Sequence, residues 1–165
     1  QDSIDAAERA RREAAERAAG EPAARDSLAR LTAERERALG EARAALSAAV
    51  YFDYDAAEIR DDARAALEAK LPLLTANAGL RLRIAGHTDS RGSDEYNLAL
   101  GQRRASSVKA WLTARGIDAS RLEIVSFGEE RGTCMEEDES CFSRNRRAEF
   151  EVTAGGESLA LPGAR

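Results

Sequence analysis

The sequence predicts an α+β domain, with a mixed four-stranded sheet and helices packed on one face, preceded by a helical extension. Three observations support this fold class. Leu80, Leu82 and Ile84 alternate with more polar residues, which is the period of a half-buried strand. A helical pattern follows and ends at Gly116, a residue suited to a left-handed helix cap. Residues 1–49 are rich in Ala, Arg and Glu, the composition of a solvent-exposed helix.

Residues 1–47 form the expected helical extension or spacer. Pro22, after Gly20 and Glu21, predicts an interruption, because proline donates no main-chain hydrogen bond and disfavours helix in the residue before it. The helix after this break carries a thin apolar stripe, made of Leu28, Leu31, Leu39, Ala42, Leu46 and Ala49. It could be a coiled-coil stalk, a helix packed on the domain or a spacer, since the stripe is too short and Ala-rich to assign a dimer.

Residues 48–154 are expected to form the domain, and residues 155–165 a flexible tail with little to bury. A first strand over 50–55 leads into a helix, which a capping-box spacing starts at Asp55 and which Pro72 bends or ends. After the central strand and its helix, strands follow at 122–127 and 147–153. The resulting order is strand, helix, strand, helix, strand, strand, which indicates a mixed sheet with helices on one face.

Charge and hydropathy exclude two classes of partner. The net charge is −5 with 33% charged residues, and an acidic chain without a clustered basic face argues against nucleic acid. The chain also lacks an apolar run of the ~18 residues that a membrane span requires. We therefore expect neither nucleic-acid binding nor a membrane span in this chain.

The two cysteines of the sequence, Cys134 and Cys141, lie close together in a polar loop, residues 132–144. Two thiolates do not complete a tetrahedral zinc site, and the single histidine, His87, is distant in sequence. A disulfide that closes the loop is the favoured interpretation, and it would fit an oxidising compartment such as the periplasm. A reduced pair remains the alternative.

One face of the helix after the central strand combines apolar residues with a cation. Its members are Asn97, Leu100, Arg104, Val108 and Trp111, so the face points inward. A buried Arg104 is costly unless the guanidinium has a partner, and Asp89 at the end of the strand is the nearest candidate. The two residues could pair with each other, which physics alone slightly favours. Alternatively, they could flank a zwitterionic ligand, with its ammonium on Asp89 and its carboxylate on Arg104.

Several separated motifs resemble the OmpA-like C-terminal domain, the peptidoglycan-binding module shared with the peptidoglycan-associated lipoproteins. The motifs are Gly86-His87-Thr88-Asp89, Tyr96-Asn97, Arg103-Arg104-Ala105, Phe127-Gly128-Glu129 and Asn145-Arg146-Arg147. The resemblance covers residues 48–153 and implies that Asp89 and Arg104 hold the zwitterionic end of diaminopimelate in the peptidoglycan stem peptide. With the resemblance, the ligand interpretation becomes the favoured one.

The resemblance also implies further ligand-binding residues around the same groove: Asp53, Thr88, Asn97, Leu100 and Arg146. Thr88 could instead only close the turn through its hydroxyl. Arg146 and Arg147 alternate faces, so only one can point at the groove, and the family pattern favours Arg146.

His87 beside Asp89 raises the possibility of a catalytic base. However, the sequence offers no convincing nucleophile partner, no metal cluster and no glycine-rich phosphate cradle. We therefore expect no catalytic residue, no metal and no cofactor, and a binding module rather than an enzyme. The resemblance implies a module that binds peptidoglycan in the periplasm and tethers an outer-membrane protein to the cell wall. An alternative is an envelope protein–protein interaction module that acts through the N-terminal helices.

Overall fold

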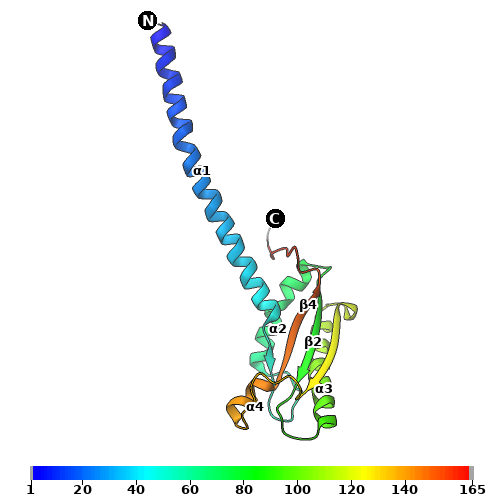
Figure 1. Ribbon diagram of the computed structural model, residues 1–165. Coiled ribbons are helices and arrows are strands. Elements are labelled where there is room, and N and C mark those ends of the chain that lie inside the picture. Colours follow the sequence, from blue (N-terminus) through cyan, green and yellow to red (C-terminus); the bar gives the residue numbers. More distant parts are fainter. Residues whose placement is uncertain (1, 164–165) are drawn as a thin grey trace. The chain divides into compact units, whose positions relative to one another are not determined.

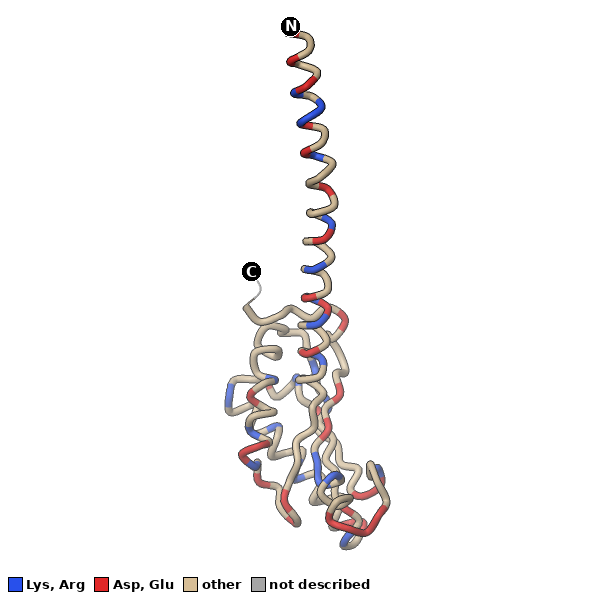
Figure 2. The backbone as a smooth tube through the Cα atoms, turned by 90° about the vertical axis from the view of Figure 1, so that its left-hand side faces the viewer, with Lys and Arg blue, Asp and Glu red and all other residues tan. Residues whose placement is uncertain are grey.

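The computed structural model describes residues 2–163, and the chain divides into two compact units, residues 1–40 and 41–165. Helix α1 (Asp2–Ser47) runs without a break through Pro22, so the predicted interruption is wrong. A helix-interior proline costs about 3 kcal/mol, but Glu21, Ala23 and Ala24 beside it are strong helix formers and favour a continuous helix. Basic and acidic residues are interleaved along α1 (Figure 2). Among residues 2–163, every helix is too short or too polar to cross a membrane.

The sheet of the second unit has the strand order β1-β4-β2-β3. Its strands are β1 (Val50–Tyr51), β2 (Arg81–His87), β3 (Leu122–Gly128) and β4 (Arg147–Ala154). Strand β4 pairs antiparallel with both β1 and β2, whereas β2 and β3 are parallel. A parallel pair requires a long crossover connection, and here that connection contains helix α3 (Asp94–Thr113). The predicted mixed four-stranded sheet is confirmed.

Helices α2 (Asp61–Ala76) and α3 pack on one face of the sheet (Figure 1), as predicted. Apolar side chains from both layers form the core, among them Leu67, Leu74, Leu82, Ile84, Val108 and Leu112. The other face carries ion pairs, such as those of Arg83 with Glu123 and Glu151. Where α3 crosses β2, a Cβ atom on Gly86 would lie 1.7 Å from the carbonyl oxygen of Gly101. This close approach fixes the first half of α3 against the end of β2.

Residues 52–60 differ most from the prediction. Strand β1 ends at Tyr51 rather than at Asp55, and α2 begins at Asp61 rather than at the proposed capping box. Asp55 has a φ of 54°, a left-handed conformation that interrupts both elements. The loop carbonyls of Asp53 and Ala56 instead accept hydrogen bonds from Arg104. Pro72 lies inside α2 and does not end it.

The last turn of α1 packs on the sheet unit, because Ala42 and Leu46 are buried. The buried Lys70 of α2 donates from Nζ to the carbonyl oxygens of Ala45, Leu46 and Ala48, at 2.7, 3.2 and 2.7 Å. Its ammonium also lies 4.1 Å from the ring centre of Phe150. Burial lowers the pKa of Lys70 to about 8.

The segment after β4 is attached to the domain in its first half. Leu159 is buried, and the Asn77 side chain exchanges two hydrogen bonds with the main chain of Ala160. These contacts attach Leu159 and Ala160, which belong to the expected tail, to the domain. Residues 164 and 165 lie outside the described residues.

Two short helices complete the described chain. A 3-10 turn (Ala119–Arg121) precedes β3, and helix α4 (Glu139–Asn145) precedes β4. Asp138 begins α4 by accepting a hydrogen bond from the main-chain N–H of Cys141. The predicted pair Cys134–Cys141 forms a disulfide that joins the first turn of this helix to the loop before it, with 5.8 Å between the two Cα atoms.

Candidate ligand-binding site

A pocket of about 140 Å³ lies where the end of β2, the start of α3 and the loop after β1 meet. Its lining combines two carboxylates, two guanidinium groups and aromatic rings: Tyr54, Asp55, Thr88, Asp89, Arg91, Gly92, Tyr96, Asn97, Leu100 and Arg104. Five predicted residues, namely Thr88, Asp89, Asn97, Leu100 and Arg104, thus lie on one cavity. Asp53 and Arg146 do not line it, although both contact residues that do.

Arg104 lies on the pocket wall with a fully buried side chain. Its guanidinium donates to three main-chain carbonyl oxygens, those of Ala56 (2.8 Å), His87 (2.9 Å) and Asp53 (3.0 Å). Burial lowers the pKa of Arg104 to about 10, so the group stays charged at neutral pH. The inward cation that the helical pattern predicted is therefore satisfied by the loop before α2 and the end of β2.

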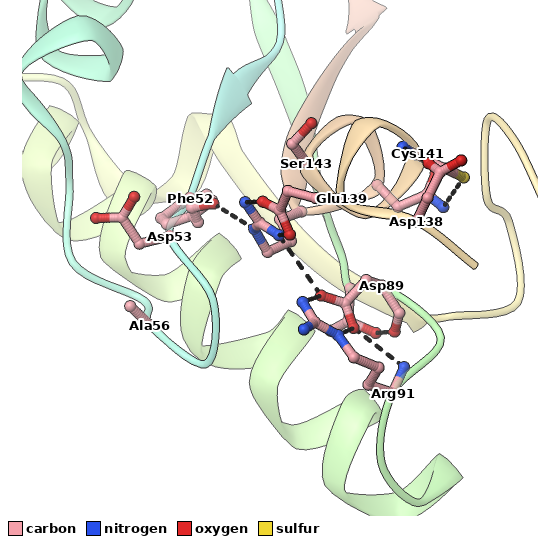
Figure 3. A network of polar contacts seen from close by, with 12 residues as sticks. Phe52, Asp53, Ala56, Asp89, Arg91, Asp138, Glu139, Cys141 and Ser143 are labelled. Carbon is pink, nitrogen blue, oxygen red and sulfur yellow. Dashed lines mark hydrogen bonds and ion pairs between the residues drawn. The ribbon is translucent and has the colours of Figure 1, made fainter. Parts of the chain in front are cut away.

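Asp89 is 4% exposed and is neutralised by two other arginines. Its Oδ1 accepts from the main-chain N–H of Arg91 at 3.0 Å and from Arg91 Nε at 3.2 Å, and its Oδ2 accepts from Arg91 Nη2 at 2.7 Å (Figure 3). Arg146 Nη1 lies 3.8 Å from Oδ2. Burial raises the pKa of this carboxyl, but the hydrogen bonds and charge of Arg91, with the charge of Arg146, more than offset it and hold the pKa below its usual range.

Asp89 and Arg104 do not pair with each other within residues 2–163, where Asp89 forms its ion pairs with Arg91 and Arg146. The simpler alternative, a direct pair that holds strand to helix, is therefore wrong for this structure. The physical reason is that carbonyl oxygens already surround the Arg104 guanidinium and a turn already delivers Arg91 to Asp89.

Arg146, and not Arg147, points to the Asp89 side. Its Nε donates to the carbonyl oxygen of Phe52 at 2.9 Å and its Nη2 to Glu139 at 2.8 Å. Arg147 turns to the opposite side, where it bonds Glu149 and the carbonyl oxygen of Arg131. This arrangement agrees with the expected alternation of the two side chains.

The remaining predicted residues have structural partners. The Asp53 carboxylate is exposed and faces Arg60. Asp53 reaches Arg104 only through its main-chain carbonyl oxygen. The Thr88 hydroxyl donates to the carbonyl oxygen of Asp89 at 3.0 Å, as a turn-closing residue would. The Asn97 amide donates to Glu129 at 3.2 Å.

Five pocket residues were not predicted as ligand-binding: Tyr54, Asp55, Arg91, Gly92 and Tyr96. The Tyr96 hydroxyl donates to the Asp55 carboxylate, which links α3 to the left-handed turn. Arg91 was detectable in principle, because an aspartate often accepts a hydrogen bond from the residue two positions later in a turn. Tyr96 belongs to a family motif, but its exposed position on α3 gives no sign of a ligand contact. Tyr54, Asp55 and Gly92 come from loops and turns with no periodic pattern, so periodicity carries no signal for them.

His87 does not line the pocket. Its side chain is buried beside Phe127, and neither imidazole nitrogen has a hydrogen-bond partner among the described residues. Nε2 lies 3.5 Å from a Glu149 carboxylate oxygen. Burial, followed by the charge of Arg147, lowers the pKa of His87 to about 4, so the imidazole is neutral at neutral pH.

Comparisons with known proteins converge on one family. The OmpA family model matches residues 51–146, a range that contains every predicted ligand-binding residue. The peptidoglycan-associated lipoprotein of Haemophilus influenzae is 43% identical over 99 residues, which are 60% of this chain and 65% of that protein. The corresponding lipoprotein of Pseudomonas putida is 43% identical over 100 residues, 61% of this chain and 60% of that protein. The matched part thus spans less than two thirds of these relatives.

Solved structures give the same result. The peptidoglycan-associated lipoprotein from Burkholderia pseudomallei superposes with a TM-score of 0.62 at 38% identity, covering 63% of this chain and 88% of that one. The cell wall anchor of the T6SS from Pseudomonas aeruginosa superposes with a TM-score of 0.57 at 25% identity, covering 72% of this chain and 95% of that one.

Proposed function

Since this chain belongs to the OmpA family, we propose that it binds peptidoglycan without catalysis and tethers a cell-envelope protein to the cell wall. The relatives quoted above are named for association with peptidoglycan, and one structural neighbour is named as a cell wall anchor. The function places the domain in the periplasm, at the outer membrane or the cell wall. The disulfide Cys134–Cys141 fits an oxidising compartment.

The proposed ligand is diaminopimelate in the stem peptide of peptidoglycan. The observation that carries this proposal is that Asp89 and Arg104 present opposite charges to one small pocket without pairing with each other. A free amino-acid end carries an ammonium and a carboxylate on one carbon, which matches that arrangement. A pocket of about 140 Å³ has room for such an end group but not for a whole stem peptide.

Each charge has a separate role in this proposal. Arg104 has five N–H donors, of which three bond the carbonyls of Ala56, His87 and Asp53. The remaining two N–H groups would donate to the ligand carboxylate. The three hydrogen bonds to carbonyl oxygens already fix the position of the guanidinium. The Asp89 carboxylate would receive the ammonium. Asp53, Thr88, Asn97, Leu100 and Arg146 would support the site by shaping its walls and holding the two charges.

A calorimetric titration of the full chain with two matched stem peptides tests the proposal. One peptide carries diaminopimelate at the third position, and the other carries lysine, which ends in an ammonium alone. We expect clear preference for diaminopimelate, because a site built for a polar group rejects the analogue that lacks it. Equal affinity for both peptides would contradict the assignment of Arg104 to the ligand carboxylate.

A second function, recruitment of an envelope protein through α1, is favoured by a separate observation. The Leu28 and Leu31 side chains are 66% and 63% exposed on that helix. Replacement of both by Glu would keep the helix and remove the two exposed leucines of its apolar stripe. Light scattering of the full chain and of this variant, each at several concentrations, tests self-association. A mass that does not change with concentration in either protein would exclude self-association through α1.

A further inference from the structure

The Asp89 carboxylate, to which the proposed function assigns the ligand ammonium, already holds a cation. Two guanidinium N–H groups of Arg91 meet its two oxygens, at 3.2 and 2.7 Å. This is the bidentate geometry that makes arginine–carboxylate pairs strong. With Asp89 only 4% exposed, an ammonium cannot reach it while the Arg91 guanidinium stays in place.

Two aromatic rings hold the guanidinium from separate segments. The Cζ atom of Arg91 lies 3.9 Å from the ring centre of Tyr54, in the loop after β1, and 4.3 Å from that of Phe142, in α4. Cations are attracted to ring faces at such distances. Asp89, Tyr54 and Phe142 therefore form a cation site, and the chain itself fills it.

The Arg91 side chain can leave Asp89 more easily than Arg146, the other cation beside this carboxylate, can. The main-chain N–H of Arg91 also bonds Asp89, so the turn keeps its shape when the side chain moves away. The Arg91 side chain is 36% exposed, which leaves it a route into solvent. Arg146, in contrast, is 7% exposed and is fixed by Phe52 and Glu139, and its Nη1 lies 3.8 Å from Asp89. Of the two cations at Asp89, Arg91 alone has both a close contact and an exit.

We propose that Arg91 is an internal competitor of the ligand, a cation of the chain that fills the Asp89–Tyr54–Phe142 site in the free protein and leaves when a ligand ammonium enters. This inference rests on the proposed function and adds a selectivity-determining residue to it. A ligand has to displace Arg91 from Asp89, so a lone ammonium that gains nothing at Arg104 competes poorly. A ligand with ammonium and carboxylate on one carbon gains both contacts.

Titration of Arg91 variants with a diaminopimelate-containing stem peptide tests the competition. If the site is open in about one molecule in ten, Arg91→Ala should bind about tenfold more tightly, because the apparent dissociation constant scales inversely with the open fraction. Arg91→Lys, which keeps the charge but loses the bidentate geometry, should fall between wild type and Arg91→Ala. Arg115→Ala is the matched control, since Arg115 stacks on Trp111 at 3.6 Å at the far end of α3. It should leave the affinity unchanged.

A second measurement separates this inference from the proposed function. The Nε–H resonance of Arg91, assigned by its loss in Arg91→Lys, should exchange slowly with water in the free protein and faster with ligand bound. Unchanged or weaker binding by Arg91→Ala, with wild type still binding, would overturn the competition while the proposed function stands. Absence of binding by wild type and by Arg91→Ala would overturn both. A rapidly exchanging Nε–H in the free protein would by itself contradict the claim that Arg91 fills the Asp89–Tyr54–Phe142 site.

Discussion

Lys70 donates a hydrogen bond of 2.7 Å to the carbonyl oxygen of Ala48, the residue that follows helix α1. The same ammonium bonds the carbonyls of Ala45 and Leu46, so a side chain of α2 satisfies carbonyls that a helix end otherwise leaves open. The sheet unit includes Glu41 and the residues after it. We therefore propose residue 41, rather than residue 48, as the start of the folding unit.

Two shortened chains test this boundary. Residues 41–165 should unfold cooperatively with nearly the stability of the full chain. Residues 48–165 should be less stable by about 2–3 kcal/mol, the order of magnitude for losing a fully buried leucine such as Leu46. Denaturant unfolding of both chains measures the difference. Equal midpoints and slopes would show that the last turn of α1 contributes nothing and would restore the boundary at 48.

Acid should destabilise the protein through His87. The folded state holds the pKa of His87 at about 4, below the ordinary value of 6.5, by burial and then by the charge of Arg147. Between these values the unfolded chain binds a proton that the folded chain does not, so stability falls as the pH drops through this window. The full effect is about 3 kcal/mol, reached near pH 4.

The His87→Leu variant isolates that effect. Leucine has no proton to bind, and the imidazole nitrogens that it replaces have no hydrogen-bond partner among the described residues. Denaturant unfolding at pH 7, 5.5 and 4 should show a smaller loss of stability in the variant than in wild type. Carboxylates titrate in both proteins, so their contribution cancels in the comparison. Parallel losses in the two proteins would mean that His87 takes up its proton in the folded state.

The Cys134–Cys141 disulfide should stabilise the domain by closing a short loop. The chain-entropy model gives about 2–3 kcal/mol for a loop of this length. Replacement of both cysteines by alanine should lower the free energy of unfolding by that amount at most, as measured by denaturant titration. Alkylation without reductant, followed by intact-mass analysis, checks the pairing in protein isolated from the periplasm. Two alkylated thiols there would contradict it.

The parts of the fold that were predicted correctly are those whose apolar residues recur with the period of a strand or a helix. The alternation at Leu80, Leu82 and Ile84 and the helical stripe through Arg104 report burial directly, so β2, α3 and the inward cation were all accessible. The partners of that cation were not, because main-chain carbonyls such as that of Ala56 leave no trace in a pattern of side chains. The Arg91 site depends on Tyr54 and Phe142, which only the fold brings together.

Asp89 and Arg104 have different partners, so we expect their variants to affect ligand binding in different ways. Asp89→Ala should weaken the diaminopimelate and lysine peptides alike, because both would lose the partner of the ammonium. Arg104→Ala should weaken only the diaminopimelate peptide, by on the order of 2–4 kcal/mol, the range for truncating one side of a buried charged pair. Calorimetric titration of wild type and each variant with both peptides gives the four comparisons.

Folding has to be controlled in this experiment, because Arg104 also bonds three carbonyls that alanine would leave unsatisfied. Arg104→Lys keeps a buried cation and serves as the second variant. The lysine ammonium cannot bond the three carbonyls and also form a bidentate pair with a carboxylate, so this variant should also lose its preference for diaminopimelate. Thermal unfolding of each protein before titration identifies any that are not folded. If folded Arg104→Lys and wild type show the same preference for diaminopimelate, the guanidinium only supports the loop before α2, and the ligand carboxylate binds elsewhere.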